Sequence, residues 1–263
     1  FTFNSVRFFV GFLAIVPLAL MFEAKKLKKE FRFDTKTFVI LSFLIGLSLF
    51  LGSALQQVAL LYTDVANAAF FTIFYVPMVP IIIFIFKKDF LHWSVWPSVI
   101  LCLIGGYLLT NFQDATVRLG DTLVVLGALF WSTHIIFTGM IVKKYNLPLT
   151  IGAIQTLLVA LFSFIIGLFS EEFVIANILN EIDSILYAGI LSGGFAFVLQ
   201  IYAQRNITPA PAAIIFSLEG VFATIAAWFL LNQILGINNL LGCFFILSGV
   251  LLSQLVPLIR KAS

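Results

Sequence analysis

The sequence predicts an all-α membrane protein, a bundle of helices that cross a lipid bilayer. Hydrophobic residues make up 62% of the 263 residues and charged residues only 10%. The apolar residues are gathered in runs of about twenty, and a helix of that length crosses the hydrocarbon layer of about 30 Å. The runs do not alternate in polarity, so a transmembrane β-barrel is not expected.

Nine membrane spans are expected in order along the chain. They occupy residues 3–22, 37–62, 65–86, 93–110, 121–142, 148–169, 184–204, 209–231 and 238–257. The connections between them are too short to hold a soluble domain. Cys102 and Cys243 lie inside spans, where small buried hydrophobes are expected rather than a disulfide or a metal site. The protein is therefore expected to act within the membrane or at its two faces.

The distribution of positive charge predicts the orientation. Lys and Arg are concentrated in alternate connections, whereas the opposite side holds Arg118 and the first span holds Arg7. Positive charge marks the cytoplasmic side of a membrane protein. We therefore expect a multi-pass protein of the cytoplasmic (inner) membrane with its C-terminus in the cytoplasm. The pI near 8.9 then reflects topology, and nucleic acid is not an expected partner.

The beginning of the sequence suggests a missing helix. Nine spans with the C-terminus inside place Phe1 outside, although Phe1 is not an initiator Met and no leader precedes the first span. We therefore expect nine helices of an original ten. A true nine-helix chain is the alternative.

A shift of the sequence by 144 residues reveals an internal repeat. The shift places span 37–62 on 184–204, span 65–86 on 209–231 and span 93–110 on 238–257. Identical residues meet without a gap, for example Gln56 with Gln200 and Gly105 with Gly249. Two domains follow from this comparison: a first repeat at residues 1–110, without its first helix, and a second repeat at residues 121–257. Five helices per half would make the halves antiparallel, an inverted 5+5 repeat of the kind found in secondary transporters.

Three segments of the chain carry a family resemblance. They are FTFNSVRFFVGFLAIVPL at the start, ALQQVALLYTDVANAAFFTIFYVPMVPIIIFIF, and AQRNITPAPAAIIFSLEGVFATIAAWFLLNQ. The sequence resembles the drug/metabolite transporter superfamily and, within it, the EamA-type transporters. Two departures are visible: Gly220 stands where the family often has Pro, and Asn232 and Gln233 stand where it often has Glu. The resemblance implies transport of small metabolites such as amino acids.

Glu219 is the strongest candidate for a functional side chain. It lies near the centre of span 209–231, where a charged group is costly and usually faces a cavity or a partner. Proton coupling or capture of a substrate amine is one interpretation, and a protonated carboxyl that joins helices is the other. The repeat places Tyr75 at the equivalent position, so both are expected to face one central cavity.

Three more candidates lie in equivalent parts of the two halves. Arg7 suits bidentate binding of a substrate carboxylate, or it extends to the outer interface instead. Asn4 lies on the same helical face as Arg7, and the gapped repeat places Gln155 opposite Arg7. Each amide either lines a pathway or bridges helices.

His134 and Trp131 are candidates within span 121–142. A histidine titrates in the range that suits a proton relay, although hydrogen bonding between helices is the more common role. Trp131 lies away from the interfacial belt and suits stacking on a planar substrate, or packing in the bundle.

The sequence therefore favours a secondary transporter that moves amino acids, related amines or drugs by alternating access, as an exporter. Its expected partners are the substrate, the bilayer and, as coupling ion, the proton. No phosphate-binding loop, metal motif or cofactor motif is present, so no catalytic residue, metal or cofactor is expected. The alternatives are an intramembrane enzyme that acts on lipids and a scaffold that does not transport.

Overall fold

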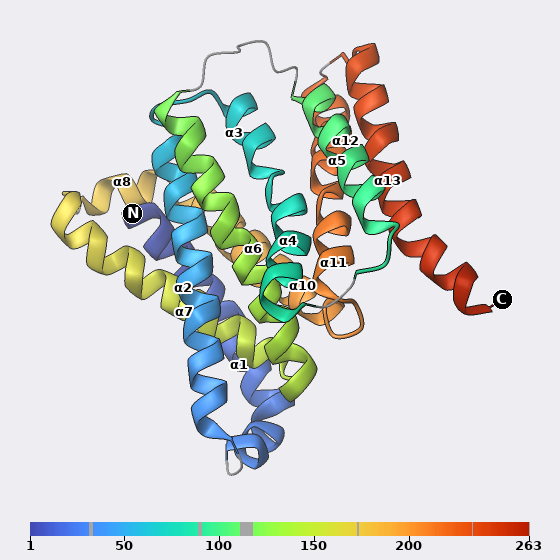
Figure 1. Cartoon of the computed structure of the whole chain (residues 1–263). Helices are drawn as coiled ribbons and strands as arrows, with labels where there is room; N and C mark the ends of the chain where they lie inside the picture. The colour runs from blue at the N-terminus through green and yellow to red at the C-terminus, as the bar shows by residue number, and fades with distance from the viewer. Residues whose placement is uncertain (32–33, 89–90, 111–117, 173, 233, 263) are drawn as a thin grey trace. The chain divides into compact units, whose positions relative to one another are not determined.

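The computed structural model describes residues 1–31, 34–88, 91–110, 118–172, 174–232 and 234–262. Within these ranges every regular element is a helix (Figure 1). Eight described segments are long and apolar enough to cross a membrane: Thr2–Lys29, Thr35–Ala59, Val65–Phe86, Leu119–Tyr145, Pro148–Ser170, Ile182–Ala203, Pro209–Leu230 and Ile237–Ile259. The apolar helix Val95–Leu109 is shorter. The predicted class, a polytopic helical membrane bundle, is confirmed in this form, whereas the number of crossings stays a prediction.

The chain forms two compact units. Unit 1 comprises Phe1–Ala54 and Phe137–Ile207, and unit 2 comprises Leu55–Ile136 and Thr208–Ser263. Each unit combines residues from both predicted repeats, so the compact units and the repeats are different divisions of the chain. The assignment of repeats to residues 1–110 and 121–257 stays a prediction.

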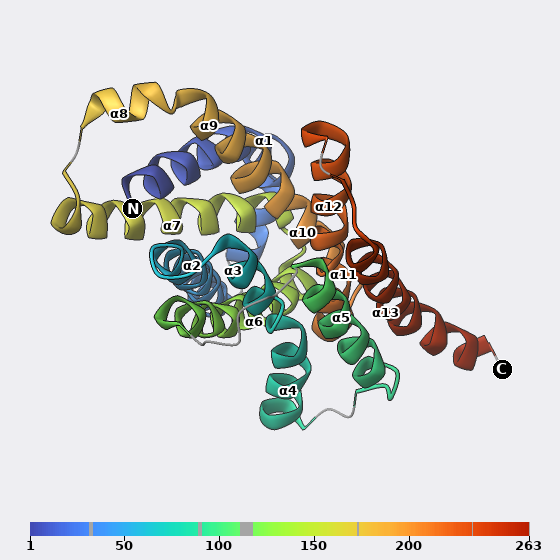
Figure 2. The same cartoon turned by 90° about the horizontal axis from the view of Figure 1, so that it is seen from above.

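Unit 1 is built around two long helices. Its elements are α1 (Thr2–Phe31), most of α2 (Thr35–Ala59), the end of α6 (Leu119–Tyr145), α7 (Pro148–Ser170), α8 (Ile175–Asn180), α9 (Ile182–Leu186), the π-helix η1 (Tyr187–Ala196) and α10 (Phe197–Ala203). Helix α1 packs along α7 (Figure 2). Near its start, the Ser5 hydroxyl donates to the Ala160 carbonyl at 3.1 Å. Further along, Ile15 lies beside Gly152, so the two helices run antiparallel.

Glu23 caps the beginning of α7 from the far end of α1. Helix α7 starts at Pro148, and Leu147 before it supplies no side-chain cap. The Glu23 carboxylate, 8% exposed, accepts hydrogen bonds from the backbone N–H groups of Leu149 at 3.1 Å and Thr150 at 2.8 Å, and from the Thr150 hydroxyl at 2.8 Å. The first N–H groups of a helix have no partner within it. A carboxylate from α1 therefore satisfies the start of α7 and holds the two helices together.

A polar contact also joins the start of α2 to the end of α6 in unit 1. Asp34, just before α2, is hydrogen-bonded to the Lys144 ammonium and accepts from the Tyr145 hydroxyl at 3.1 Å. The Lys144 hydrogen bond, helped by Thr37, lowers the pKa of Asp34 below its ordinary value. Beneath this contact lies an apolar cluster of Phe38, Leu41, Ile45, Ile141, Val142, Tyr145, Leu147, Ile151 and Ile201.

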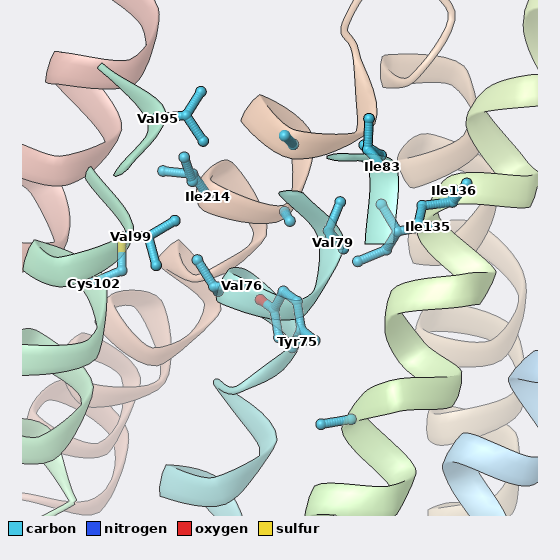
Figure 3. Close-up of a cluster of buried hydrophobic side chains, with 13 residues drawn as sticks. Tyr75, Val76, Val79, Ile83, Val95, Val99, Cys102, Ile135, Ile136 and Ile214 are labelled. Atoms are coloured by element: carbon cyan, nitrogen blue, oxygen red, sulfur yellow. The ribbon is translucent and has the colours of Figure 1, made fainter. Parts of the chain in front are cut away.

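Unit 2 contains two candidate membrane spans that are each interrupted. Its elements are the end of α2, α3 (Val65–Thr72), α4 (Tyr75–Lys87), α5 (Val95–Leu109), most of α6, α11 (Pro209–Phe216), α12 (Leu218–Leu231) and α13 (Ile237–Ala262). The pairs α3–α4 and α11–α12 each form one candidate span broken near its middle. An apolar cluster from α4, α5, α6 and α11 fills the centre of the unit (Figure 3).

Helices α5 and α13 pack closely because small residues line their contact. A Cβ atom added to Gly105 would lie 2.7 Å from the Gly242 carbonyl oxygen, and one added to Gly249 would lie 2.8 Å from the Ser98 carbonyl oxygen. The order of these contacts shows that the two helices are antiparallel. Small residues let membrane helices approach with their backbones in contact.

Candidate functional site

The interruptions in α3–α4 and α11–α12 have similar backbone angles. Ile73, Phe74 and Ser217 all have φ near −60° and ψ of −15°. The N–H groups of Ile73 and Phe74 bond three residues back, to Phe70 at 3.1 Å and Phe71 at 3.2 Å. The break in α3–α4 is therefore a tightened turn of the 3₁₀ type, which within a helix often marks a functional hinge. At the second break the Ser217 N–H bonds four residues back, to the Ala213 carbonyl at 3.3 Å.

Different residues produce the two interruptions. Pro77 follows the first and has no N–H, so the Ile73 carbonyl accepts from Val76 at 2.9 Å instead. In the second, the Ser217 hydroxyl donates to the Ile214 carbonyl at 2.6 Å and lies 3.4 Å from Cys102 Sγ. A side-chain hydroxyl bonded to the preceding turn bends a helix. The missing Pro at Gly220 therefore does not remove the break.

Helix boundaries recur 144 residues apart in these two segments. Asp64 and Thr208 precede them with almost the same backbone angles, φ −77°, ψ 152° and φ −75°, ψ 154°. Lys88 and Asn232 end them in the left-handed conformation, each with φ 52°. Neither residue is glycine, and such angles are uncommon for other residues. The two segments therefore share a start, a break and an end.

Tyr75 begins the second half of the first interrupted helix. It is 6% exposed, and its hydroxyl has no hydrogen-bond partner among the described residues. Figure 3 shows the ring beside Val76, with Ile135 and Ile136 of α6 on the other side from the hydroxyl oxygen. An unpaired hydroxyl in the interior is costly to stability.

Glu219 lies in the first turn of α12, near the middle of the candidate span Pro209–Leu230. Part of the Glu219 surface is exposed, and no ion pair joins it to another described residue. The positive end of the α12 dipole favours a carboxylate at this place. Tyr75 and Glu219 both belong to unit 2.

Trp131 and His134 also belong to unit 2. Trp131 packs against the apolar cluster that contains Tyr75. The His134 ring meets it edge-on with 6.1 Å between centroids, and His134 is fully buried. Between them in sequence, Ser132 donates to the Ala128 carbonyl at 2.7 Å and lies 3.4 Å from the Tyr75 carbonyl oxygen. Sequence reasoning missed Ser132 and Ser217, because a serine in a span has no signal beyond its polarity.

The other three candidates belong to unit 1. Asn4 and Gln155 are buried, with 3% and 1% of their surfaces exposed. The Arg7 guanidinium carbon lies 4.8 Å from the centroid of the Phe8 ring, a cation–π contact, and its buried Nε has no hydrogen-bond partner among the described residues. The seven candidates thus form two sets: Asn4, Arg7 and Gln155 in unit 1, and Tyr75, Trp131, His134 and Glu219 in unit 2.

Within the described residues, no group of three or more His, Cys, Asp or Glu side chains is arranged to hold a metal ion. The chemistry at hand is therefore that of a carboxylate, a phenol and aromatic rings in unit 2, and of a guanidinium and amides in unit 1. In proteins, side chains of these kinds can bind amines, carboxylates and planar rings.

Comparison with known proteins gives concordant results. Residues 118–255 match the EamA-like transporter family. An uncharacterized transporter of Archaeoglobus fulgidus is 30% identical over 97% of this chain and 77% of its own length. The uncharacterized transporter YoaV of Bacillus subtilis is 24% identical over 98% of this chain and 88% of its own. A solved crystal structure superposes with a TM-score of 0.80, covering all of this chain and 88% of that one at 15% identity, which shows a shared fold.

Proposed function

We propose that this chain, which belongs to the EamA-like transporter family, is a secondary transporter that moves small metabolites by alternating access. The observation that carries the proposal is the pair of interrupted helices with Tyr75 and Glu219 in the first turns after the breaks. Interrupted membrane helices expose helix ends to bound substrates and ions in secondary transporters. Amino acids or related amines and drugs are the proposed substrates, and export is the proposed direction.

The inverted repeat is part of the proposal. It is supported by the helix start, break and end that recur at the offset of 144 found in the sequence. The close contacts of α5 with α13 also support it. The offset of 144 makes Gly249 the equivalent of Gly105, and Ser98 the equivalent of Gly242. The contact between Gly105 and Gly242 therefore predicts a contact between Gly249 and Ser98, and the structure has both contacts. Antiparallel packing of α5 on α13 is what two inverted halves would produce.

Glu219 is the proposed coupling group. It lies at mid-span, at a helix N-terminus, and is not engaged by another described side chain. A carboxylate so placed can exchange a proton or bind a substrate amine. Tyr75 and Trp131 would then shape recognition beside it, while His134 serves as a buried structural partner. Arg7, Asn4 and Gln155 of unit 1 are further proposed substrate-binding groups, and Arg7 suits a carboxylate.

The protein is proposed to lie in the cytoplasmic membrane of the cell. Its C-terminus is proposed to lie on the cytoplasmic side. The support is the count of Lys and Arg in alternate connections. An intramembrane enzyme remains the alternative class, and nothing in the described groups favours it.

The test is transport by the full-length protein in proteoliposomes. A panel of labelled amino acids and amines is offered with and without a pH gradient, to wild type, Glu219→Gln and, as control, Asp183→Asn at an exposed position. We expect Glu219→Gln to lose flux driven by the pH gradient and to keep substrate exchange without a gradient. Unchanged gradient-driven flux in this variant removes Glu219 from coupling, and no flux of any compound by wild type contradicts a transporter of these substrates.

A further inference from the structure

The last turns of α1 extend past the apolar part of that helix. Helix α1 has 30 residues, about 45 Å at 1.5 Å per residue, whereas the hydrocarbon layer is about 30 Å thick. The sequence from Glu23 to Phe31 therefore lies at the level of lipid headgroups or beyond.

One face of α1 changes from apolar to positive at this level. Leu18, Met21 and Phe22 are 46%, 77% and 67% exposed. Three exposed lysines follow them, Lys25, Lys28 and Lys29. The spacing of three and four residues places all six on one side of the helix. We call this the lysine stripe; it begins as a surface suited to acyl chains and ends as one suited to anions.

The opposite face of the same turns is fixed to the protein. Glu23 caps α7 through three hydrogen bonds. Lys26 donates to the Asn146 carbonyl at 3.0 Å, and Leu27 packs against the apolar cluster of unit 1. These contacts prevent the end of α1 from rotating. The lysine stripe is therefore held on the face of α1 that points away from these contacts, which lowers the ordering cost of binding.

The positive charges of the lysine stripe are not neutralised by the described carboxylates. Glu23 is occupied by α7, and Asp34 is hydrogen-bonded to Lys144. The remaining acid of the segment, Glu30, has a side chain outside the described residues. Lys25, Lys28 and Lys29 thus present charge at the boundary between the apolar layer and water.

We infer that the lysine stripe binds an anionic phospholipid, whose phosphate meets Lys25, Lys28 and Lys29 while an acyl chain lies along Leu18, Met21 and Phe22. The apolar half of the stripe favours a lipid over a soluble anion, because a free phosphate has no acyl chain to contact these apolar side chains. Lysine clusters directly beyond a membrane helix attract anionic lipids. The inference is independent of the transport proposal and of the leaflet in which the stripe lies.

The experiment measures lipid binding to the full-length protein in phosphatidylcholine nanodiscs with increasing phosphatidylglycerol. Bound phosphatidylglycerol is counted by native mass spectrometry, and thermal unfolding is followed in parallel. The variant is the double Lys25→Gln, Lys29→Gln, and the matched control is the double Lys36→Gln, Lys88→Gln, which removes the same charge at exposed lysines elsewhere. Each lysine is expected to contribute about fivefold to lipid affinity.

We expect the stripe variant to bind phosphatidylglycerol some tens of times more weakly and to lose the thermal stabilisation by that lipid, while the control keeps both. High salt should remove the difference between wild type and variant. Soluble glycerol phosphate at equal concentration should have no effect. Equal binding by variant and wild type, an equal loss in the control, or an equal effect of glycerol phosphate would each overturn the inference. If the double variant does not fold, the single variants Lys25→Gln and Lys29→Gln replace it, and each should bind phosphatidylglycerol about fivefold more weakly than wild type.

Discussion

The two units place a glutamate in opposite circumstances. In unit 1, Glu23 is nearly buried and accepts three hydrogen bonds at the start of α7. In unit 2, Glu219 is exposed at the start of α12 and has no ion-pair partner among the described residues. Each acid lies at the N-terminus of a helix. Glu219 belongs to that helix, α12, whereas Glu23 belongs to α1 and caps α7. The comparison teaches that one acid joins two helices, whereas the other is the acid proposed for binding or coupling.

Removal of the structural acid should have the largest effect on stability. We expect Glu23→Ala to lower the free energy of unfolding by about 2–3 kcal/mol, because two backbone N–H groups of α7 lose a charged acceptor. Thermal unfolding in detergent measures this. Glu172→Ala, at an exposed position, is the control and should be neutral. If Glu23→Ala unfolds like wild type while Glu219→Gln is destabilised, the roles given to the two acids are reversed.

A methyl group between α5 and α13 should have the next largest effect. Ala at Gly105 places Cβ 2.6 Å from Ile246 Cγ1 and 2.7 Å from the Gly242 carbonyl oxygen. We expect Gly105→Ala to cost about 1–3 kcal/mol through this crowding. Gly249→Ala should behave alike if the offset of 144 relates the two positions.

The matched control for these glycines is Gly167→Ala in unit 1. Its nearest neighbour, Thr2, would lie at 3.5 Å, an ordinary contact. Because alanine favours a helix over glycine, this variant should unfold at the same temperature as wild type or higher. Equal destabilisation at Gly105 and Gly167 would contradict close α5–α13 packing as the cause.

Tyr75→Phe separates stability from transport. The Tyr75 hydroxyl has no partner among the described residues, so its removal should leave the unfolding temperature unchanged or raise it slightly. Transport by proteoliposomes should fall about tenfold if the hydroxyl contributes one hydrogen bond to the substrate or to Glu219. A destabilised variant with normal flux would show that the hydroxyl belongs to the fold.

The smallest effect is expected at Asp34, and it depends on pH. The Lys144 hydrogen bond keeps the pKa of Asp34 below its ordinary value of 3.8, so the folded protein releases this proton more readily than the unfolded chain. The resulting stabilisation is complete above the ordinary pKa and is lost as pH falls toward the folded value. Asp34→Asn should flatten the change of unfolding temperature below about pH 4, and an unchanged acid profile would rule out this contribution.

Much of the fold was visible in local patterns. Runs of apolar residues predicted helices where the structure has them, because a backbone in lipid must satisfy its hydrogen bonds within a helix. The offset of 144 also anticipated where equivalent boundaries lie, at Asp64 and Thr208 and at Lys88 and Asn232. The break at Ser217 was not anticipated, because Gly220 replaces the expected Pro and the serine hydroxyl acts through a carbonyl in the preceding turn.

The sequence alone determined that this chain is a helical membrane protein, since hydropathy is a local property. Only the tertiary structure decided what each polar side chain does. Glu23 stood in a polar connection with no sign of a role, and its partners at Leu149 and Thr150 lie more than a hundred residues away. Whether a carboxylate accepts hydrogen bonds from the backbone depends on which N–H groups lie near it. Those N–H groups come from distant parts of the sequence, so their positions are set by the tertiary fold.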